Sequence, residues 1–171
     1  MAERTGIVTA GGNPVTLVGN EVNVGDKAPD FIAIGNDMKP VAFSSFGAKT
    51  LVITAVPSLD TDVCSVEVAR FNGEAEKFGD DVAIVTISMD LPFAQARWCG
   101  AHGVTNVTTV SDHRDAAFGT AYGVLIKETR LLARSVFVVD REGVVRYIQI
   151  VPELSHEPDY DAVLKAIEDL K

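Results

Sequence analysis

Apolar runs and helical periodicities alternate along the chain, and this alternation predicts an α/β fold. Residues 49–56 and 81–88 are mostly apolar, which is typical of strands buried on both faces of a sheet. Between them, apolar side chains recur three and four positions apart over residues 64–78, as in an amphipathic helix. A second helix is predicted over residues 90–102, because a proline lies in its first turn and a glycine follows its end.

The C-terminal half adds a second set of elements. A short strand is predicted over residues 107–110 and a short helix over residues 114–122. Residues 134–140 have a strong strand pattern, which passes through a glycine turn and returns as a hairpin partner over residues 144–151. A last helix, capped by Asp159, carries one apolar stripe.

Near the N-terminus, two short strand patterns flank Gly19-Asn20, a pair that tolerates the positive φ angles of a two-residue turn. This predicts an N-terminal β-hairpin over residues 15–24, and we also expect a helical insertion around residues 122–132. The remaining order of elements predicts a thioredoxin-like α/β fold with a central mixed β-sheet flanked by helices. No linker or repeat interrupts it, so residues 1–171 are interpreted as one domain.

The charge balance excludes several classes of partner. The chain has 24 acidic and 15 basic residues, which gives a formal net charge of −9. This argues against nucleic-acid binding, which needs a basic face, and against docking on anionic lipid. No apolar stretch approaches the length of a membrane span, and the first residues lack the basic start and apolar run of a secretory signal. We therefore expect a cytoplasmic protein that binds neither nucleic acid nor membrane.

The chain has two cysteines, Cys64 and Cys99, which are too few for a disulfide framework and too far apart for a CxxC motif. Cys64 follows a buried strand where a helix begins, and a helix N-terminus stabilises a thiolate. Thr61 lies three residues earlier, close enough in a turn for its hydroxyl to reach the sulfur. Pro57 would shape this turn and shield the thiolate. Position alone leaves open that Cys64 is a buried, inert cysteine.

The spacing Pro57-x-x-x-Thr61-x-x-Cys64 resembles the active-site motif of the peroxiredoxins. Its surroundings resemble the thiol peroxidase branch of that family, the atypical two-cysteine type of bacteria. The similarity extends over most of the chain and includes residues 15–17, 22–31, 36–37, 39–41, 67, 70–72, 88–94, 122–124, 131–140 and 157–160.

The resemblance implies a role for each candidate residue. Cys64 would be the peroxidatic cysteine, which attacks a hydroperoxide and becomes a sulfenic acid, and Thr61 would hydrogen-bond the thiolate and the peroxide. Arg134 matches the active-site arginine of the family. It opens an apolar strand, where a guanidinium is costly without an anion; Arg130 is a rival in more polar surroundings. Cys99 matches the resolving cysteine, which would form an intramolecular disulfide with Cys64.

By the same resemblance, the protein is expected to be an antioxidant enzyme that reduces hydrogen peroxide and organic hydroperoxides. Thioredoxin would be its reductant, and neither a cofactor nor a metal would be needed. Two copies would form a homodimer through the face near the active site.

Two other classes of function stay open. A zinc site could combine Cys99 and His102 with Cys64 and His113. The protein could instead be a non-catalytic redox sensor or an interaction module, which would not turn over peroxide steadily.

Asp62 departs from the residues usual at this position of the family. We expect it to point to solvent, because an inward acid would oppose thiolate formation.

Overall fold

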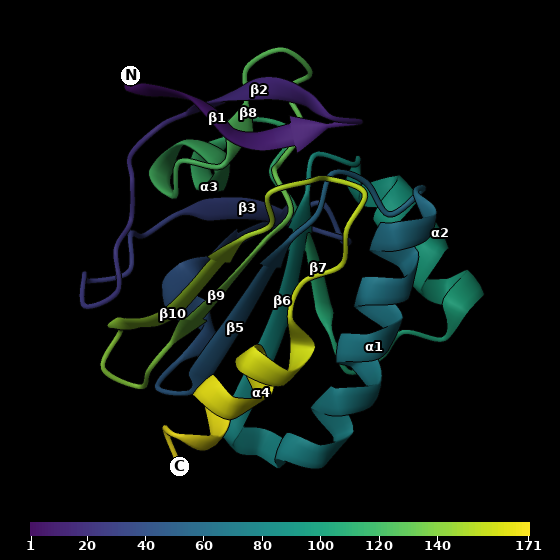
Figure 1. Cartoon of the computed structure of the whole chain (residues 1–171). Coiled ribbons are helices and arrows are strands. Elements are labelled where there is room, and N and C mark those ends of the chain that lie inside the picture. Colours follow the sequence, from purple (N-terminus) through teal and green to yellow (C-terminus); the bar gives the residue numbers. More distant parts are fainter.

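The computed structural model describes the whole chain, residues 1–171, as two β-sheets packed with four α-helices (Figure 1). The strands are β1 (Glu3–Ala10), β2 (Asn13–Val18), β3 (Ile32–Gly35), β4 (Pro40–Ala42), β5 (Thr50–Ala55), β6 (Val82–Ser88), β7 (Thr108–Ser111), β8 (Leu125–Ile126), β9 (Ser135–Val139) and β10 (Val145–Ile150). The helices are α1 (Asp62–Phe78), α2 (Pro92–His102), α3 (Ala117–Ala121) and α4 (Tyr160–Glu168), with 3-10 turns at Phe43–Phe46 and Gly79–Asp81.

The larger sheet has the strand order β10-β9-β5-β6-β7-β3-β4, and the smaller sheet has the order β1-β2-β8. In the middle of the larger sheet, β5 runs parallel to β6 and antiparallel to β9, so the sheet is mixed. This confirms the thioredoxin-like α/β fold with a central mixed sheet flanked by helices.

Side chains that alternate along the central strands build two separate cores, one on each face of the larger sheet. Leu51 of β5 faces a core of 23 buried residues, which the small sheet and α3 complete. Val52 faces a core of 14 buried residues beneath α1, α2 and α4. The neighbouring strand β9 alternates in the same way, with Phe137 in the first core and Val138 in the second. Cys64 belongs to the second core, so the helical face of the sheet carries the candidate site.

Seven predicted elements correspond to β5, α1, β6, α2, β7, β9 and β10, with ends within two residues of the prediction. The predicted cap of α4 is confirmed, because the Asp159 carboxylate accepts the N–H of Ala162 (3.1 Å). The helix predicted over residues 114–122 is shorter, because Ala116 has a left-handed φ of 48° and the helix starts only after it. The Asp112 carboxylate then accepts the N–H groups of Phe118 (3.0 Å) and Gly119 (2.8 Å) in the first turn. None of the helices combines the length and the apolar character that crossing a membrane requires.

The N-terminal hairpin is present, but its predicted position over residues 15–24 is wrong. Its strands are β1 and β2, and its turn is Gly11-Gly12, where both residues have positive φ angles (57° and 83°) as a two-residue turn requires. Gly19 also has a positive φ (120°), but it lies too close to the backbone of Thr120 to allow a Cβ. The next residue, Asn20, donates its N–H to the Thr120 carbonyl (2.9 Å). These contacts pack the chain against α3, so no turn forms there.

The helical insertion predicted around residues 122–132 is also wrong. After Gly123, which has a positive φ of 67°, the chain forms the short strand β8 and pairs with β2. Arg130 adopts a left-handed φ of 55° and donates its N–H to the Ile126 carbonyl (2.8 Å), which reverses the chain. The apolar residues of this segment complete the first core, so they are buried by the small sheet and not by a helix.

Candidate active site

Cys64 lies in the first turn of α1, directly after the loop that follows β5. Thr61 is the N-cap of the helix and has extended backbone angles (φ −100°, ψ 147°), so Cys64 is the third helical residue. The Cys64 side chain is fully buried and its thiol is free. The positive end of the helix dipole and the unpaired N–H groups of this turn stabilise negative charge on the sulfur.

Arg134, immediately before β9, places its guanidinium against Cys64 and is 1% exposed. Its Nη2 donates to the Cys64 sulfur (3.3 Å), and its Nη1 donates to the Glu67 carboxylate (2.7 Å). Both Nε and Nη2 also donate to the backbone carbonyl of Leu154 (3.2 and 2.8 Å). Burial opposes the charge, but the neighbouring Cys64 and Glu67 outweigh it and raise the pKa of Arg134. The structure therefore keeps a cation beside the sulfur.

Glu67 is a site residue that sequence reasoning missed. It lies one turn after Cys64 and is fully buried, although the helical pattern places it outside the apolar stripe. Burial raises the pKa of Glu67 to about 7, in spite of the opposing Arg134, and its Oε1 has no hydrogen-bond partner. Two signals could have identified it. Residues three apart share a helix face, and a buried Arg134 needs an anion.

Pro57 and Thr61, in the loop before α1, differ in their burial. Pro57 is buried at the end of β5, whereas Thr61 is exposed. The Thr61 hydroxyl donates to the carbonyl of Ser58 (3.0 Å) and so closes the loop. The bond expected from this hydroxyl to the Cys64 sulfur is not formed in this structure. Asp62 is exposed, in agreement with its predicted orientation.

Asp90, in the turn before α2, ties this loop to the second helix. One carboxylate oxygen accepts the hydroxyl of Ser58 (2.7 Å), and the other accepts the N–H of Leu59 (2.8 Å) and the hydroxyl of Ser88 (2.8 Å). The Ser88 hydroxyl in turn accepts the side-chain amide of Gln95 on α2 (3.0 Å). This network holds the loop that leads into the cysteine-bearing turn, and it was not predicted from the sequence.

Cys99 lies on α2, partly exposed, and its thiol is also free. Its sulfur is 3.5 Å from the Thr109 hydroxyl. The preceding residue, Trp98, donates its indole N–H to the hydroxyl of Ser65 (2.9 Å), the residue after Cys64. The two cysteine-bearing helices are therefore packed and hydrogen-bonded together while the cysteines stay unbonded.

The histidines of the alternative zinc site have other partners. His102 stacks on Trp98 and its Nδ1 lies 2.9 Å from the Trp98 carbonyl, and His113 Nδ1 lies 2.8 Å from the Ser111 hydroxyl. No group of three or more His, Cys, Asp or Glu side chains is arranged to hold a metal ion. The rival arginine, Arg130, is exposed in its turn, and it is Arg134 that donates a hydrogen bond to Cys64.

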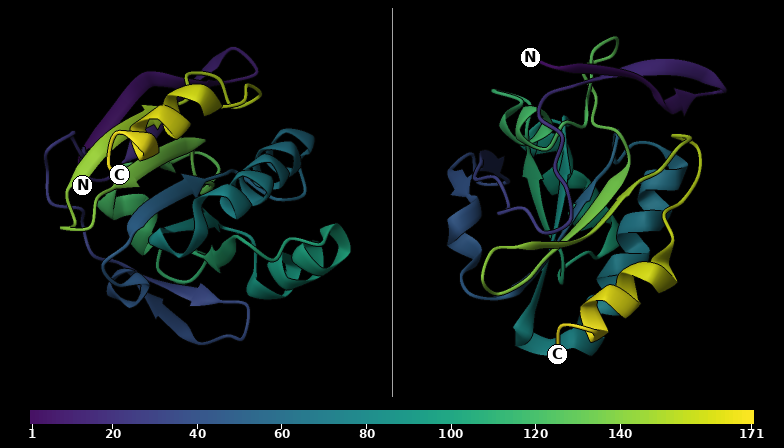
Figure 2. Two further views of the ribbon diagram at one scale, coloured as in Figure 1. Left: turned by 90° about the horizontal axis from the view of Figure 1, so that it is seen from below. Right: turned by 60° about the vertical axis from the view of Figure 1, so that its left-hand side comes forward.

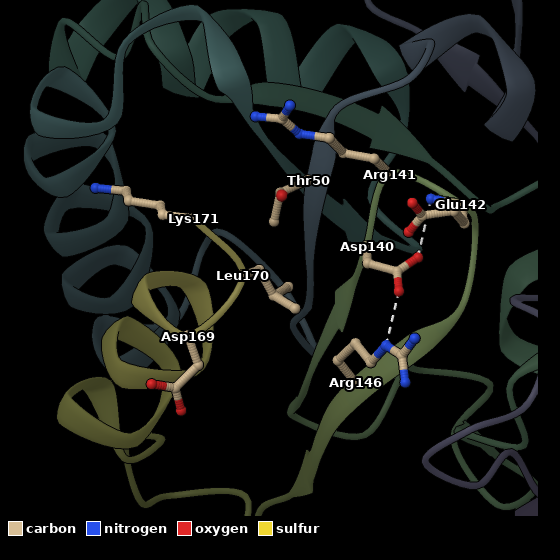
Figure 3. A pocket seen from close by; sticks show the side chains of 8 residues that line it. All are labelled: Thr50, Asp140, Arg141, Glu142, Arg146, Asp169, Leu170 and Lys171. Atoms are coloured by element: carbon tan, nitrogen blue, oxygen red, sulfur yellow. Dashed lines mark hydrogen bonds and ion pairs between the residues drawn. The ribbon is translucent and has the colours of Figure 1, made fainter.

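A cavity of about 510 Å³, shown in Figure 3, contains none of these site residues in its lining. Thr50 and Asp140 line it, at the end of β5 opposite to the one that leads to Cys64. The Asp140 carboxylate accepts hydrogen bonds from Nε of Arg146 (2.6 Å) and from the N–H of Glu142 (3.0 Å). Its negative charge is therefore paired within the wall of the cavity. A second hollow, of about 420 Å³, lies over the first turn of α1. It is lined by Asp62, Val63, Val66, Ser155, His156 and Glu157. Only this second hollow is next to the cysteine-bearing turn.

The fold and the site together define a class of thioredoxin-fold enzymes with a cysteine at a helix N-terminus and an arginine beside it. A sequence model of the Redoxin family matches residues 23–164. A thiol peroxidase of Bacillus subtilis (strain 168) is 52% identical over 163 residues, which cover 95% of this chain and 97% of that protein. A thiol peroxidase of Oceanobacillus iheyensis is 53% identical over 157 residues, which cover 92% and 95%.

Solved structures agree with these sequence relatives. A peroxiredoxin-like protein from Aquifex aeolicus superposes with a TM-score of 0.91 at 43% identity, covering 98% of both chains. A thiol peroxidase from Chromobacterium violaceum has the same fold, with a TM-score of 0.85 at 24% identity over 95% of both chains. The chain belongs to the redoxin family, in the thiol peroxidase branch of the peroxiredoxins. It is accordingly an oxidoreductase of the peroxidase class.

Proposed function

We propose that the protein reduces hydrogen peroxide and organic hydroperoxides with Cys64 as the peroxidatic cysteine. The observation that carries this proposal is the hydrogen bond of the Arg134 guanidinium to the buried Cys64 sulfur (3.3 Å) in the first turn of α1. A thiolate is the reactive form of cysteine, and a fixed cation and a helix N-terminus both favour it. The relatedness to thiol peroxidases supports the same chemistry.

In the first step, the Cys64 thiolate attacks the terminal oxygen of the hydroperoxide. A sulfur–oxygen bond forms, the oxygen–oxygen bond breaks, and the products are a cysteine sulfenic acid and water or an alcohol. The sulfur loses two electrons, and the leaving oxygen gains them and takes up a proton. Negative charge moves from the sulfur to this leaving oxygen, and Arg134 is placed to stabilise it at both ends of the transfer.

In the second step, the Cys99 thiolate attacks the Cys64 sulfenic sulfur. The sulfur–sulfur bond forms, the sulfur–oxygen bond breaks, and the leaving hydroxide takes up a proton from solvent and departs as water. Cys64 is fully buried in α1 while Cys99 is partly exposed on α2, so the first turn of α1 has to open before the bond can close. Opening breaks the bond between Trp98 and Ser65. A dithiol reductant of the thioredoxin type then restores both thiols by disulfide exchange.

The surroundings of the site support two further parts of the proposal. The hollow beside the first turn of α1, where the Val66 side chain is 54% exposed, is the surface by which a hydroperoxide approaches. Leu91 and Phe93 lie at the start of α2, next to Asp90, which binds the loop before α1. They are 52% and 67% exposed, which supports a homodimer formed through the face near the active site. We place the enzyme in the cytoplasm in an antioxidant role, where thioredoxin keeps it reduced.

The test is peroxide-dependent oxidation of NADPH in the presence of thioredoxin and thioredoxin reductase. The wild-type protein should turn over steadily, and Cys64→Ser should be inactive. Cys99→Ser should complete one stoichiometric turnover to the sulfenic acid, which excess peroxide then over-oxidises. Peroxide turnover by Cys64→Ser at a rate near that of the wild type would contradict the assignment. A wild-type protein that reacts once and is not recycled would indicate a redox sensor instead.

A further inference from the structure

The backbone carbonyl of Leu154 accepts two of the four hydrogen bonds that the Arg134 side chain donates. The other two bonds go to Cys64 and Glu67, both on α1. A guanidinium is planar and has its donors in a fixed fork, so the position of one acceptor sets the direction of the remaining donors. The segment that contains Leu154 therefore determines how Arg134 faces the sulfur.

This segment, between β10 and α4, is held by the N-terminal hairpin. The N–H of Thr9 donates to the Pro152 carbonyl (2.8 Å), and the N–H of Leu154 donates to the Thr9 carbonyl (3.0 Å). At the hairpin turn, the N–H of Gly12 donates to the Glu153 carboxylate (2.8 Å). The loop after β10 lies beside the hairpin in both Figure 1 and the right-hand view of Figure 2. One parallel β-bridge, between Thr9 and Glu153, thus joins the segment to β1.

We propose that the N-terminal hairpin is a positioning element of the active site and that Glu153 is the positioning residue that fastens it. The hairpin fixes the Leu154 carbonyl, and this carbonyl fixes the guanidinium of Arg134 toward Cys64. The hairpin makes no hydrogen bond to Cys64 or Arg134, so its effect is transmitted only through residues 152–154. This inference rests on the proposed roles of Cys64 and Arg134.

Glu153 is suited to this role because it is the only side chain of the segment that bonds the hairpin turn. Gly12 has a positive φ of 83°, which aims its N–H at the carboxylate. The Gly12 hydrogen bond, together with N–H groups of the segment itself, holds the pKa of Glu153 below its usual range, so the carboxylate is an ionised acceptor at neutral pH. Loss of this acceptor frees the turn while the two backbone bonds of Thr9 remain.

The chain provides a matched control on the other edge of the same hairpin. The carboxylate of Glu128 accepts the N–H of Thr16 on β2 (3.0 Å), just as that of Glu153 accepts the N–H of Gly12. Hydrogen bonds from the hairpin lower the pKa of both carboxyls. Glu128 follows β8 and has no bond to the segment that holds Arg134. A loss of hairpin stability alone should therefore affect both variants alike.

The experiment compares Glu153→Ala, Glu153→Gln and Glu128→Ala in the Cys99→Ser background. It measures the second-order rate constant for oxidation of Cys64 by hydrogen peroxide, with the sulfenic acid trapped by dimedone, and the urea midpoint of each protein. Glu153→Ala should slow the reaction about threefold to tenfold, the effect of one hydrogen bond felt at the reacting group. Glu153→Gln keeps an acceptor oxygen and should stay within about twofold of the parent, as should Glu128→Ala.

Equal rates for Glu153→Ala and Glu128→Ala, whether slowed or unchanged, would overturn the role of the hairpin. Failure of Glu153→Gln to restore the rate would do the same, because the proposal requires only an acceptor at this position. A parent protein in which peroxide does not oxidise Cys64 would instead overturn the proposed function itself. The two failures are therefore distinguishable in one set of measurements.

Discussion

Replacement of Glu67 by glutamine should change how the stability of the fold depends on pH. Glu67 is fully buried beside Arg134, and burial raises its pKa from 4.5 to about 7. Glutamine has nearly the same shape but does not titrate, so Glu67→Gln removes this ionisation and keeps an oxygen that can accept the Arg134 hydrogen bond.

The sign follows from proton binding. An acid with a raised pKa binds more protons in the folded state than in the unfolded state between pH 4.5 and pH 7, so its contribution to stability falls as pH rises through that range. At 1.36 kcal/mol per pKa unit, wild-type protein should lose about 2 to 3 kcal/mol relative to Glu67→Gln between pH 5 and pH 8. The stability difference between the two proteins should therefore shift in favour of Glu67→Gln by this amount from pH 5 to pH 8.

The assay is urea unfolding of the reduced proteins at pH 5 and pH 8, followed by the fluorescence of Trp98, the single tryptophan. Glu74→Gln on the same helix is the matched control. Glu74 bonds to Lys77 and Arg70, which lowers its pKa, so it stays ionised in both states across this range. Its difference from the wild type should be nearly the same at both pH values. A Glu67→Gln difference that is also constant would show that Glu67 is ionised throughout, and that the pairing with Arg134 outweighs burial.

Three other predictions concern the residues around the two cysteines. Arg134→Ala should slow the peroxide step by about 10²–10³-fold in rapid-quench measurements, which is the usual effect of losing one transition-state donor. Arg130→Ala should leave the rate unchanged, and equal effects of the two substitutions would contradict the assignment of Arg134. Asp90→Asn gives up acceptors for the loop before α1, so urea unfolding should show a loss of about 1 to 3 kcal/mol, and an unchanged midpoint would mean that this network is not stabilising. The disulfide between Cys64 and Cys99 should stabilise the fold by less than the roughly 3–4 kcal/mol of loop closure, because the first turn of α1 has to unwind. The test compares the free energy of unfolding of the oxidised and reduced proteins, together with amide exchange over residues 61–72 and 92–102. A gain of the full amount of roughly 3–4 kcal/mol, with the same exchange protection in both states, would contradict the prediction.

The sequence predicted the parts of the fold that depend on local pattern. The apolar run of β5 and the helical stripe of α1 placed Cys64 at a helix start, and the structure has it there. The cost of burying a charge pointed to a partner for the Arg134 guanidinium, and the structure shows hydrogen bonds from it to Glu67 and to the Cys64 sulfur. The hairpin position was misread because Gly11-Gly12 and Gly19 both allow positive φ, and only packing against α3 decides between them.

The parts that could not be predicted depend on contacts between segments far apart in the chain. The burial of Glu67 depends on its bond to Arg134, which is 67 positions further along the chain. The Leu154 carbonyl is a backbone atom, so no side-chain pattern marks it, and its hold on Arg134 depends on a hairpin more than 140 residues earlier. One local contact was also missed, because the Thr61 hydroxyl donates to the Ser58 carbonyl and not to the Cys64 sulfur.

The most direct test of the proposed chemistry is stoichiometric titration with hydrogen peroxide, followed by mass spectrometry of the intact protein and of its cysteine peptides. One equivalent should convert the wild-type protein into the form that has lost two hydrogen atoms and links Cys64 to Cys99. The Cys99→Ser protein should gain one oxygen atom, on Cys64. An unchanged Cys64, or oxygen added first to Cys99, would contradict the role of Cys64 as the residue that attacks the peroxide.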